Sequence, residues 1–217
     1  MMKLALNHSN GAPFRILCLG AHCDDIEIGC GGTILKLLEE KKNIEVQWVV
    51  FSSDARRGKE ARRAASRFLK AAKTKTVEAK TFRDTFFPFV GSKIKDHFRQ
   101  LQKRFSPDLI FTHFRNDLHQ DHRLISELTW NAFRDHVILE YEIPKYDGDL
   151  ASPNVYVQLD ERLCKQKVGY ILDSFPSQRT KQWFTEDTFL ATLRLRGIES
   201  NSATKYAEGF YCRKLTI

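Results

Sequence analysis

The sequence predicts an α/β fold, a mostly parallel sheet with helices on both faces, in one domain spanning residues 1–217. Short apolar runs alternate with stretches of helical periodicity through the first two thirds of the chain, and this alternation is typical of parallel sheets. The 217 residues include 42% hydrophobic residues, enough for one substantial core. No internal repeat, low-complexity tract or long linker divides the sequence.

Apolar runs and helical spacing give the expected elements in chain order. We expect strands at residues 14–21, 44–52, 76–80 and 107–113. Helices are predicted around Ile34–Leu38, in the basic segment 56–75, over residues 94–105 and from about Asp121. The alternation of strand and helix patterns is less regular after Ala132. In this part we expect strands at 137–144 and 154–159 and helices at 160–173 and 185–197. The last helix is expected to end at Gly197.

The composition favours a cytoplasmic protein without stable membrane insertion. No apolar run approaches the roughly 18 residues needed to cross a bilayer, and the N-terminal apolar stretch is too short and too polar for a signal peptide. The five cysteines form no C-x-x-C pair. Neither a disulfide framework nor a zinc finger is therefore indicated, and we expect reduced thiols.

Much of the net charge of +8 lies in the segment 56–75. Its apolar residues fall at helical spacing and its basic residues occupy the other positions, which is typical of a solvated helix face. Attraction of an anionic substrate or a membrane surface is the alternative. Apart from Phe68, which the spacing puts in the core, no aromatic residue is interleaved with the basic ones, so nucleic acid is not an expected partner.

Two polar loops are expected to meet at the carboxyl edge of the sheet. In open α/β sheets the active crevice lies where the strand order reverses, and in the usual order 3-2-1-4 the first and fourth strands are neighbours. The loops after these strands are "AHCDDIE" and "THFRNDLHQDHRL". Together they gather the following ionisable residues: His22, Asp24, Asp25, Glu27, His113, Asp117, His119, Asp121 and His122.

This set of side chains is suited to a catalytic metal ion, because zinc sites of this kind use about three histidine or carboxylate ligands and keep one position open. His22 and Asp25 can point into one cavity, and His122 offers a third ligand. Zinc, or another divalent transition metal, would polarise a substrate carbonyl and lower the pKa of a bound water to about 7. The alternative is a helix cap with no further role.

Other residues of the two loops are candidates for catalysis. Asp24 can accept a proton from water. His119 can stabilise an oxyanion or protonate a departing amine, with Asp121 or Asp117 holding its ring, and Asp117 is also a candidate for substrate binding. The acidic pair ahead of the glycines at 29, 31 and 32 would repel a pyrophosphate, so dinucleotide binding is not expected.

The motifs "AHCDDIEIGCGGTI" and "SPDLIFTHFRNDLHQDHR", together with "RRGKEARRAA", "SQ" and "YAEGF", resemble those of the PIG-L or LmbE-like deacetylases over nearly the whole chain. The resemblance implies a Rossmann-like fold. It also implies a zinc-dependent hydrolase that removes an acyl group, commonly acetyl, from the amine of an N-acylated amino sugar or a related conjugate. Homo-oligomers are possible by the same resemblance.

Position by position, the resemblance matches residues to roles. His22, Asp25 and His122 match the metal ligands, Asp24 the general base, and His119 the histidine at the oxyanion or leaving group. Arg57 and Asp84 fall where the family tends to contact sugar hydroxyls, and surface salt bridging is the alternative for both.

One departure from the family motif is Cys23, which replaces the usual proline between the histidine and the aspartate. Loss of proline would loosen the loop. A thiolate could instead ligate the ion or react with oxidants. In the third interpretation, cysteine is tolerated as a small apolar residue whose side chain is turned away.

Two other functions fit the same motifs. The site could cleave an amide in a secondary metabolite or a thiol-sugar conjugate, or an ester. Alternatively, the protein could be loaded with metal but not catalytic, and bind an anionic partner. The segment "LEYEIPKYDGD" is expected to border the substrate pocket, with Glu142, Tyr146 and Asp147 as candidate contacts. The expected partner is a small N-acylated sugar or conjugate.

Overall fold

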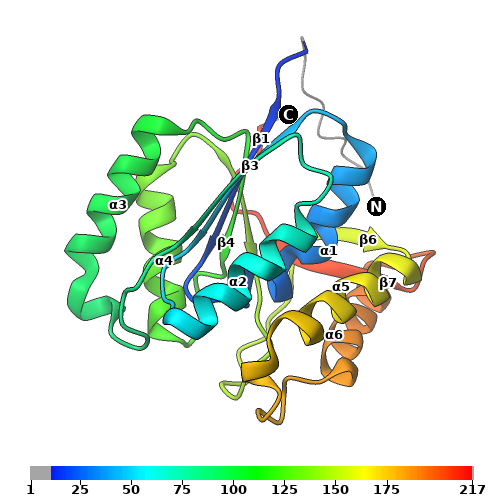
Figure 1. The fold of residues 1–217 in the computed structure, drawn as a ribbon. Helices are drawn as coiled ribbons and strands as arrows, with labels where there is room; N and C mark the ends of the chain where they lie inside the picture. The colour runs from blue at the N-terminus through cyan, green and yellow to red at the C-terminus, as the bar shows by residue number, and fades with distance from the viewer. Residues whose placement is uncertain (1–10, 217) are drawn as a thin grey trace.

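The chain folds as one layer of strands between two layers of helices (Figure 1). The computed structural model describes residues 11–216. The strands are β1 (Phe14–Gly20), β2 (Ile44–Val50), β3 (Thr74–Ala79), β4 (Leu109–His113), β5 (Val137–Tyr141), β6 (Val155–Leu159) and β7 (Tyr206–Tyr211). The helices are α1 (Asp25–Glu40), α2 (Ala55–Phe68), α3 (Gly91–Arg104), α4 (Gln120–Ala132), α5 (Glu161–Ser174) and α6 (Glu186–Glu199), with 3-10 turns η1 (Phe87–Val90) and η2 (Pro176–Gln178).

The strands form a single sheet in the order β3-β2-β1-β4-β5-β7-β6. β1 pairs in parallel with β2 and β4, β3 extends the sheet beyond β2, and β5 extends it beyond β4. The predicted order 3-2-1-4 is therefore confirmed. β7 runs antiparallel between β5 and β6. The sequence does not predict this strand, because a glutamate and a glycine interrupt its apolar pattern.

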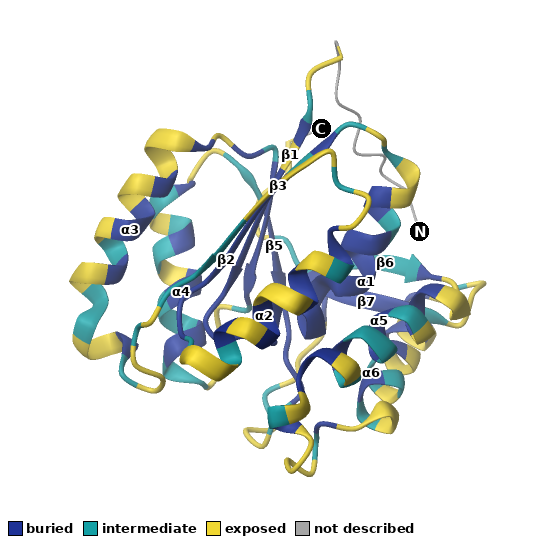
Figure 2. Cartoon of the chain, in the orientation of Figure 1, coloured by how far each residue is buried: buried dark blue, intermediate teal, exposed yellow. Residues whose placement is uncertain are grey.

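Strand β1 illustrates how both faces of the sheet are buried, as the dark strands of Figure 2 show. Ile16 and Cys18 pack in the core beneath α1, α2, α5 and α6, whereas Leu17 and Leu19 pack on the other face with α3 and α4. Successive side chains of a strand point to opposite faces, so a strand that is apolar throughout needs helices on both sides. Across residues 11–216, no helix combines the length and apolar content that crossing a membrane requires.

Glycines allow helix α1 to lie close to its neighbours. A Cβ at Gly29 would lie 2.1 Å from the ring of Tyr141 at the end of β5. A Cβ at Gly31 would lie 2.6 Å from the ring of Phe68 on α2. Only glycine fits at these two positions, and this close packing fixes the first turn of α1 at the carboxyl edge of the sheet.

Helix α6 continues past Gly197 to Glu199, so the prediction that Gly197 closes this helix is wrong. A Cβ at Gly197 would lie 1.9 Å from the carbonyl oxygen of Lys205. The position therefore needs glycine because the segment leading into β7 passes close to the helix, and not because the helix ends there.

Candidate metal centre

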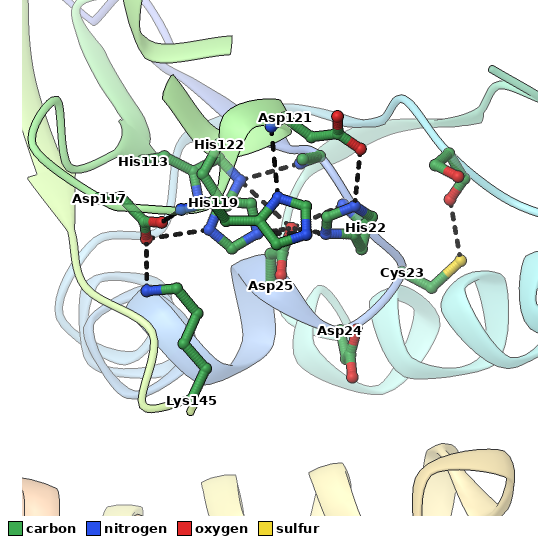
Figure 3. A network of polar contacts seen from close by, with 12 residues as sticks. His22, Cys23, Asp24, Asp25, His113, Asp117, His119, Asp121, His122 and Lys145 are labelled. Atoms are coloured by element: carbon green, nitrogen blue, oxygen red, sulfur yellow. Dashed lines mark hydrogen bonds and ion pairs between the residues drawn. The ribbon is translucent and has the colours of Figure 1, made fainter. Parts of the chain in front are cut away.

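The two polar loops meet at the carboxyl edge of the sheet because β1 and β4 are neighbours (Figure 3). His22 follows β1, and Asp24 and Asp25 open α1. From the other loop, His119 caps the N-terminus of α4 and His122 lies in its first turn. The fold thus brings together the residues that the sequence singled out from positions about 100 residues apart.

Three nitrogen and oxygen atoms converge at the centre of this cluster. His22 Nδ1 lies 3.1 Å from His122 Nε2. Asp25 Oδ2 lies 3.4 Å from His22 Nδ1 and 3.6 Å from His122 Nε2. Tetrahedral zinc with bonds of about 2.0–2.2 Å requires donors about 3.3–3.6 Å apart. The two distances to Asp25 Oδ2 lie in this range, and the distance of 3.1 Å between the two histidine nitrogens is slightly shorter.

Hydrogen bonds on the outer side of each ring decide which nitrogen is free to bind a metal. His122 Nδ1 lies 2.9 Å from Asp117 Oδ2, and because a carboxylate only accepts, Nδ1 carries the proton and Nε2 keeps its lone pair. His22 Nε2 likewise faces Asp84 Oδ1 at 2.9 Å and Asp121 Oδ2 at 3.2 Å. In the neutral rings His22 Nδ1 and His122 Nε2 therefore both keep a lone pair, and they lie close to each other and to Asp25 Oδ2, a donor set that suits a divalent cation.

The surroundings shift the pKa values of His122 and His22 in opposite directions. Burial, reinforced by the neighbouring His113, lowers the pKa of His122 to about 3, so this imidazole stays neutral. Burial also opposes a charge on His22, but Asp25 and the carboxylates on its outer side hold the pKa of His22 well above its usual value. A cation, whether a proton or a metal ion, is thus stabilised at His22, and metal binding would displace the proton.

Asp24 is buried next to Asp25 but is directed toward α2, away from the histidines (Figure 3). Its Oδ1 accepts a hydrogen bond of 2.7 Å from Arg57 Nη2. Among the described residues, no group donates a hydrogen bond to Oδ2. One oxygen of this carboxylate is therefore fixed by a cation, and the other is available to a ligand or to water.

The ring of His119 is held by a backbone N–H rather than by a carboxylate, which differs from the prediction. Asp117 Oδ1 accepts the backbone N–H of His119 at 2.8 Å, and neither Asp117 nor Asp121 hydrogen-bonds the ring by its carboxylate. Instead, His119 Nδ1 accepts the backbone N–H of Asp121 at 3.2 Å. Burial, together with the nearby His22, lowers the pKa of His119. The neutral ring therefore carries its proton on Nε2, which makes Nε2 a hydrogen-bond donor.

The carboxylate of Asp121 instead organises the loop after β3. Its oxygens accept the backbone N–H groups of Thr85 at 2.7 Å and Phe87 at 3.1 Å, in addition to facing His22. Thr85 has a positive φ of 65°, which is strained for a β-branched residue. Asp121 thus stabilises the backbone that presents Asp84 to the site.

The predicted substrate contacts fall into two groups. The side chain of Asp84 is 56% exposed beside His22, and Arg57 reaches Asp24, so both border the cluster. Asp117, in contrast, is buried behind His122. Glu142 is buried away from the cluster, because the guanidinium of Arg196 on α6 binds both of its oxygens at 2.6 and 2.7 Å. The sequence predicts that Asp117 and Glu142 contact substrate, but in the structure neither carboxylate is exposed to one.

His113 joins the cluster without a role assigned from sequence. It is fully buried, its Nε2 accepts the backbone N–H of Ala21 at 2.9 Å, and its ring stacks on His122 with centroids 3.9 Å apart and planes 18° apart. Lone pairs lie in the ring plane, so two stacked imidazoles do not converge on one ion. The signal in the sequence is its position at the end of β4, one residue from the loop.

Cys23 points away from the site. Its thiol is buried and donates to the carbonyl oxygen of Ser52 at 3.3 Å. Burial raises the pKa of this thiol to about 12. The interpretation of Cys23 as a small buried residue with its side chain turned away is confirmed, and a thiolate ligand is not indicated.

A family model, PIG-L: GlcNAc-PI de-N-acetylase, matches residues 17–133. The match spans more than half of the 217 residues and includes both motif loops. The chain belongs to the PIG-L family. All three converging residues, His22, Asp25 and His122, lie within the PIG-L match.

Solved structures share the fold of this PIG-L chain at low sequence identity. N,N'-diacetylchitobiose deacetylase from Pyrococcus horikoshii is 22% identical, with a TM-score of 0.70 over 92% of this chain and 84% of that chain. GalB, the 4-carboxy-2-hydroxymuconate hydratase from Pseudomonas putida KT2440, is 17% identical, with a TM-score of 0.71 over 94% and 97%. The zinc-inhibited form of teicoplanin deacetylase Orf2 is 13% identical, with a TM-score of 0.70 over 91% and 97%. Because a hydratase shares this fold with deacetylases, the fold alone does not assign the reaction.

Proposed function

We propose that this protein is a metal-dependent deacetylase that hydrolyses the amide of an N-acylated amino sugar or a related conjugate. The observation that carries the proposal is the convergence of His22 Nδ1, Asp25 Oδ2 and His122 Nε2 within 3.1–3.6 Å, in a chain of the PIG-L family. The reaction consumes one water and yields a carboxylate and an amine.

His22, Asp25 and His122 would hold the ion, and their nitrogen and oxygen donors suit zinc or another divalent transition metal. When bound, the ion would act as a Lewis acid toward a carbonyl and make a nearby water more acidic. Neighbouring carboxylates set the tautomers of the two histidine ligands. Asp117 accepts the outer N–H of His122, and Asp84 and Asp121 accept that of His22.

Asp24 is proposed as the general base. Arg57 fixes its Oδ1, so the orientation of the carboxylate is set before substrate binds, and Oδ2 can take the proton of the attacking water. The same proton can then pass to the nitrogen of the departing amine.

His119 is proposed to stabilise the oxyanion. Its Nδ1 is occupied by the backbone N–H of Asp121, so the ring acts through Nε2–H as a neutral hydrogen-bond donor. This arrangement favours the oxyanion role over protonation of the leaving amine, because a second proton on Nδ1 would face the backbone N–H. Asp84, at the exposed side of the cluster, is proposed to contact sugar hydroxyls.

The first experiment measures metal content and amine release together. The purified protein and His122→Ala are tested for bound zinc and for free amine released from N-acetylglucosamine, N,N'-diacetylchitobiose and other N-acetylated sugars. We expect about one zinc per chain and amine release in the wild type, with both lost in the variant. Full activity of a metal-free protein would overturn the proposal, whereas metal binding without amine release from any sugar would reject the substrate class.

A further inference from the structure

Lys145, in the loop after β5, contacts the same carboxylate oxygen as His122. Asp117 Oδ2 accepts from His122 Nδ1 at 2.9 Å and lies 3.1 Å from Lys145 Nζ. Figure 3 shows Lys145 reaching this carboxylate from below, while the histidines lie to the right of Asp117. No motif or spacing in the sequence singles out this lysine.

Lys145 also binds a second carboxylate, that of Asp149 from its own loop. Asp149 Oδ2 in turn accepts the backbone N–H of Leu118 at 2.8 Å. The side chains of Lys145, Asp117 and Asp149 are only 10%, 2% and 6% exposed. Loop 144–150 is therefore attached to the segment that carries Asp117 through one nearly buried cation between two buried carboxylates.

A buried carboxylate that loses its cation is costly, because only neutral hydrogen-bond donors then stabilise the charge, without the help of water. Without Lys145, the carboxylates of Asp117 and Asp149 would also repel each other. The energetically favourable response is for loop 144–150 to move away and admit water, which would leave Asp117 free to turn from His122. The orientation of His122 thus depends on a residue that never touches it.

We propose that Lys145 is a positioning residue that couples loop 144–150 to His122 through Asp117. The inference rests on the proposed function in one respect, namely that His122 is a metal ligand. Binding linkage is reciprocal. A metal on His122 therefore orders loop 144–150, and contacts made by the loop strengthen metal binding.

The tip of this loop is open to a ligand. Tyr146 is 72% exposed and the side chain of Asp147 is 41% exposed, while the turn at Gly148 has a positive φ of 64°. A substrate that engages these residues would act on a loop whose two ends are fixed by Lys145 and Asp149. Such a contact would link substrate recognition to the metal site through the same coupling.

The test measures metal affinity and loop exchange rather than turnover alone. Zinc affinity is determined by chelator competition for the wild type, Lys145→Met, Lys145→Arg and the control Lys36→Met. Lys36 donates to the carbonyl oxygen of Gln158 on β6 and has no contact with the site. Hydrogen exchange of residues 144–150 is followed with and without zinc, and the absorption spectrum of the cobalt-substituted proteins reports ligand geometry.

In Lys145→Met we expect zinc affinity to fall by about 10-fold or more, and the cobalt spectrum to change. In the wild type, zinc should slow exchange in the loop by at least about fivefold, an effect that Lys145→Met should lose. Lys145→Arg should retain most of the coupling because it keeps the cation, and Lys36→Met should match the wild type.

Wild-type zinc affinity in folded Lys145→Met would overturn the inference. If that variant does not fold, the wild type alone decides, because loop exchange that is the same with and without zinc also overturns it. A protein that binds zinc with the expected coupling but releases no amine from any substrate would reject the proposed function and leave the role of Lys145 intact.

Discussion

Arg57 Nη2 donates a hydrogen bond of 2.7 Å to Asp24 Oδ1, which joins the first turn of α2 to the start of α1. The side chains of Arg57 and Asp24 are 18% and 6% exposed. By resemblance, Arg57 falls where the family contacts sugar hydroxyls, but here its nearest partner is the proposed general base. The pair makes the position of Asp24 depend on a cation from another helix.

We predict that Arg57→Met lowers kcat by up to about 100-fold, because misplacing a catalytic group by about 1 Å has an effect of this size. Zinc content should stay at the wild-type level, since Arg57 contacts none of the proposed ligands. Steady-state amine release and metal analysis measure both. The neighbouring Arg56, whose side chain is 71% exposed, supplies the matched control Arg56→Met. A rise in KM with unchanged kcat would instead make Arg57 a substrate contact.

Asp117→Asn is predicted to weaken zinc binding by about 10- to 100-fold, because partners of a metal-ligating histidine contribute that much to affinity. The carboxylate accepts from His122 Nδ1 at 2.9 Å, and an amide is a poorer acceptor that can also present its own N–H. Chelator competition measures the change. Asp173→Asn, at an exposed surface ion pair with Arg67, is the control and should bind zinc normally. Unchanged affinity in Asp117→Asn would remove His122 Nε2 from the ligand set.

These two predictions show where reasoning from the sequence stops. The positions of His22, Asp25 and His122 follow from strand order, because loops after neighbouring parallel strands share one edge of the sheet. Which carboxylate holds which ring does not follow. Asp117 and Asp121 are both within reach of the histidines, and their choice depends on Thr85 and Lys145, which enter from loops after β3 and β5.

The strands, too, are only partly predictable from the sequence. Parallel strands such as β1 are apolar on both faces and stand out in the sequence, so the sheet order around them is predictable. Strand β7 carries the buried Glu208, which accepts from the backbone of Gly32 and Thr33 and pairs with Lys167 at 2.6 Å. A buried charged residue interrupts the apolar alternation of a strand, and its partners lie far away in the sequence. Hydropathy alone therefore does not reveal this strand.

Cys23→Ala is predicted to keep both zinc and activity within about twofold, because the thiol is buried, faces Ser52 and is not a ligand. Its pKa, raised to about 12 by burial, also protects it from alkylation at neutral pH. Cys212 is the one half-buried thiol of the five. Reaction of the native protein with a thiol reagent, followed by mass spectrometry, should modify Cys212 first. Rapid modification of Cys23 with loss of zinc would contradict the structure.

Acid is predicted to destabilise the fold through His97. Burial, reinforced by Lys80, lowers the pKa of His97 to about 4, below the value of about 6.5 in an unfolded chain. Between these values the unfolded chain binds more protons, so the free energy of unfolding falls as the pH drops from about 6.5 to about 4. Urea denaturation at pH 7, 5.5 and 4.5 measures this. His97→Gln should show a shallower dependence than the wild type, and equal slopes would exclude His97 as the cause.

Gly29→Ala is predicted to destabilise the protein by about 2 kcal/mol or more, because it forces extra volume into a packed core. The new Cβ would lie 2.1 Å from Tyr141 Cδ2. The ring cannot retreat easily, since it is fully buried and its hydroxyl donates to the carbonyl oxygen of Leu19 at 2.7 Å. Gly169→Ala on α5 is the matched control, because its Cβ would meet nothing within 4 Å and should gain up to about 1 kcal/mol of helix propensity. Denaturant unfolding of both variants measures the difference, and a Gly29→Ala protein as stable as Gly169→Ala would mean that α1 can shift away from β5. In that case the first turn of α1, and Asp25 with it, would be less firmly held than the packing indicates.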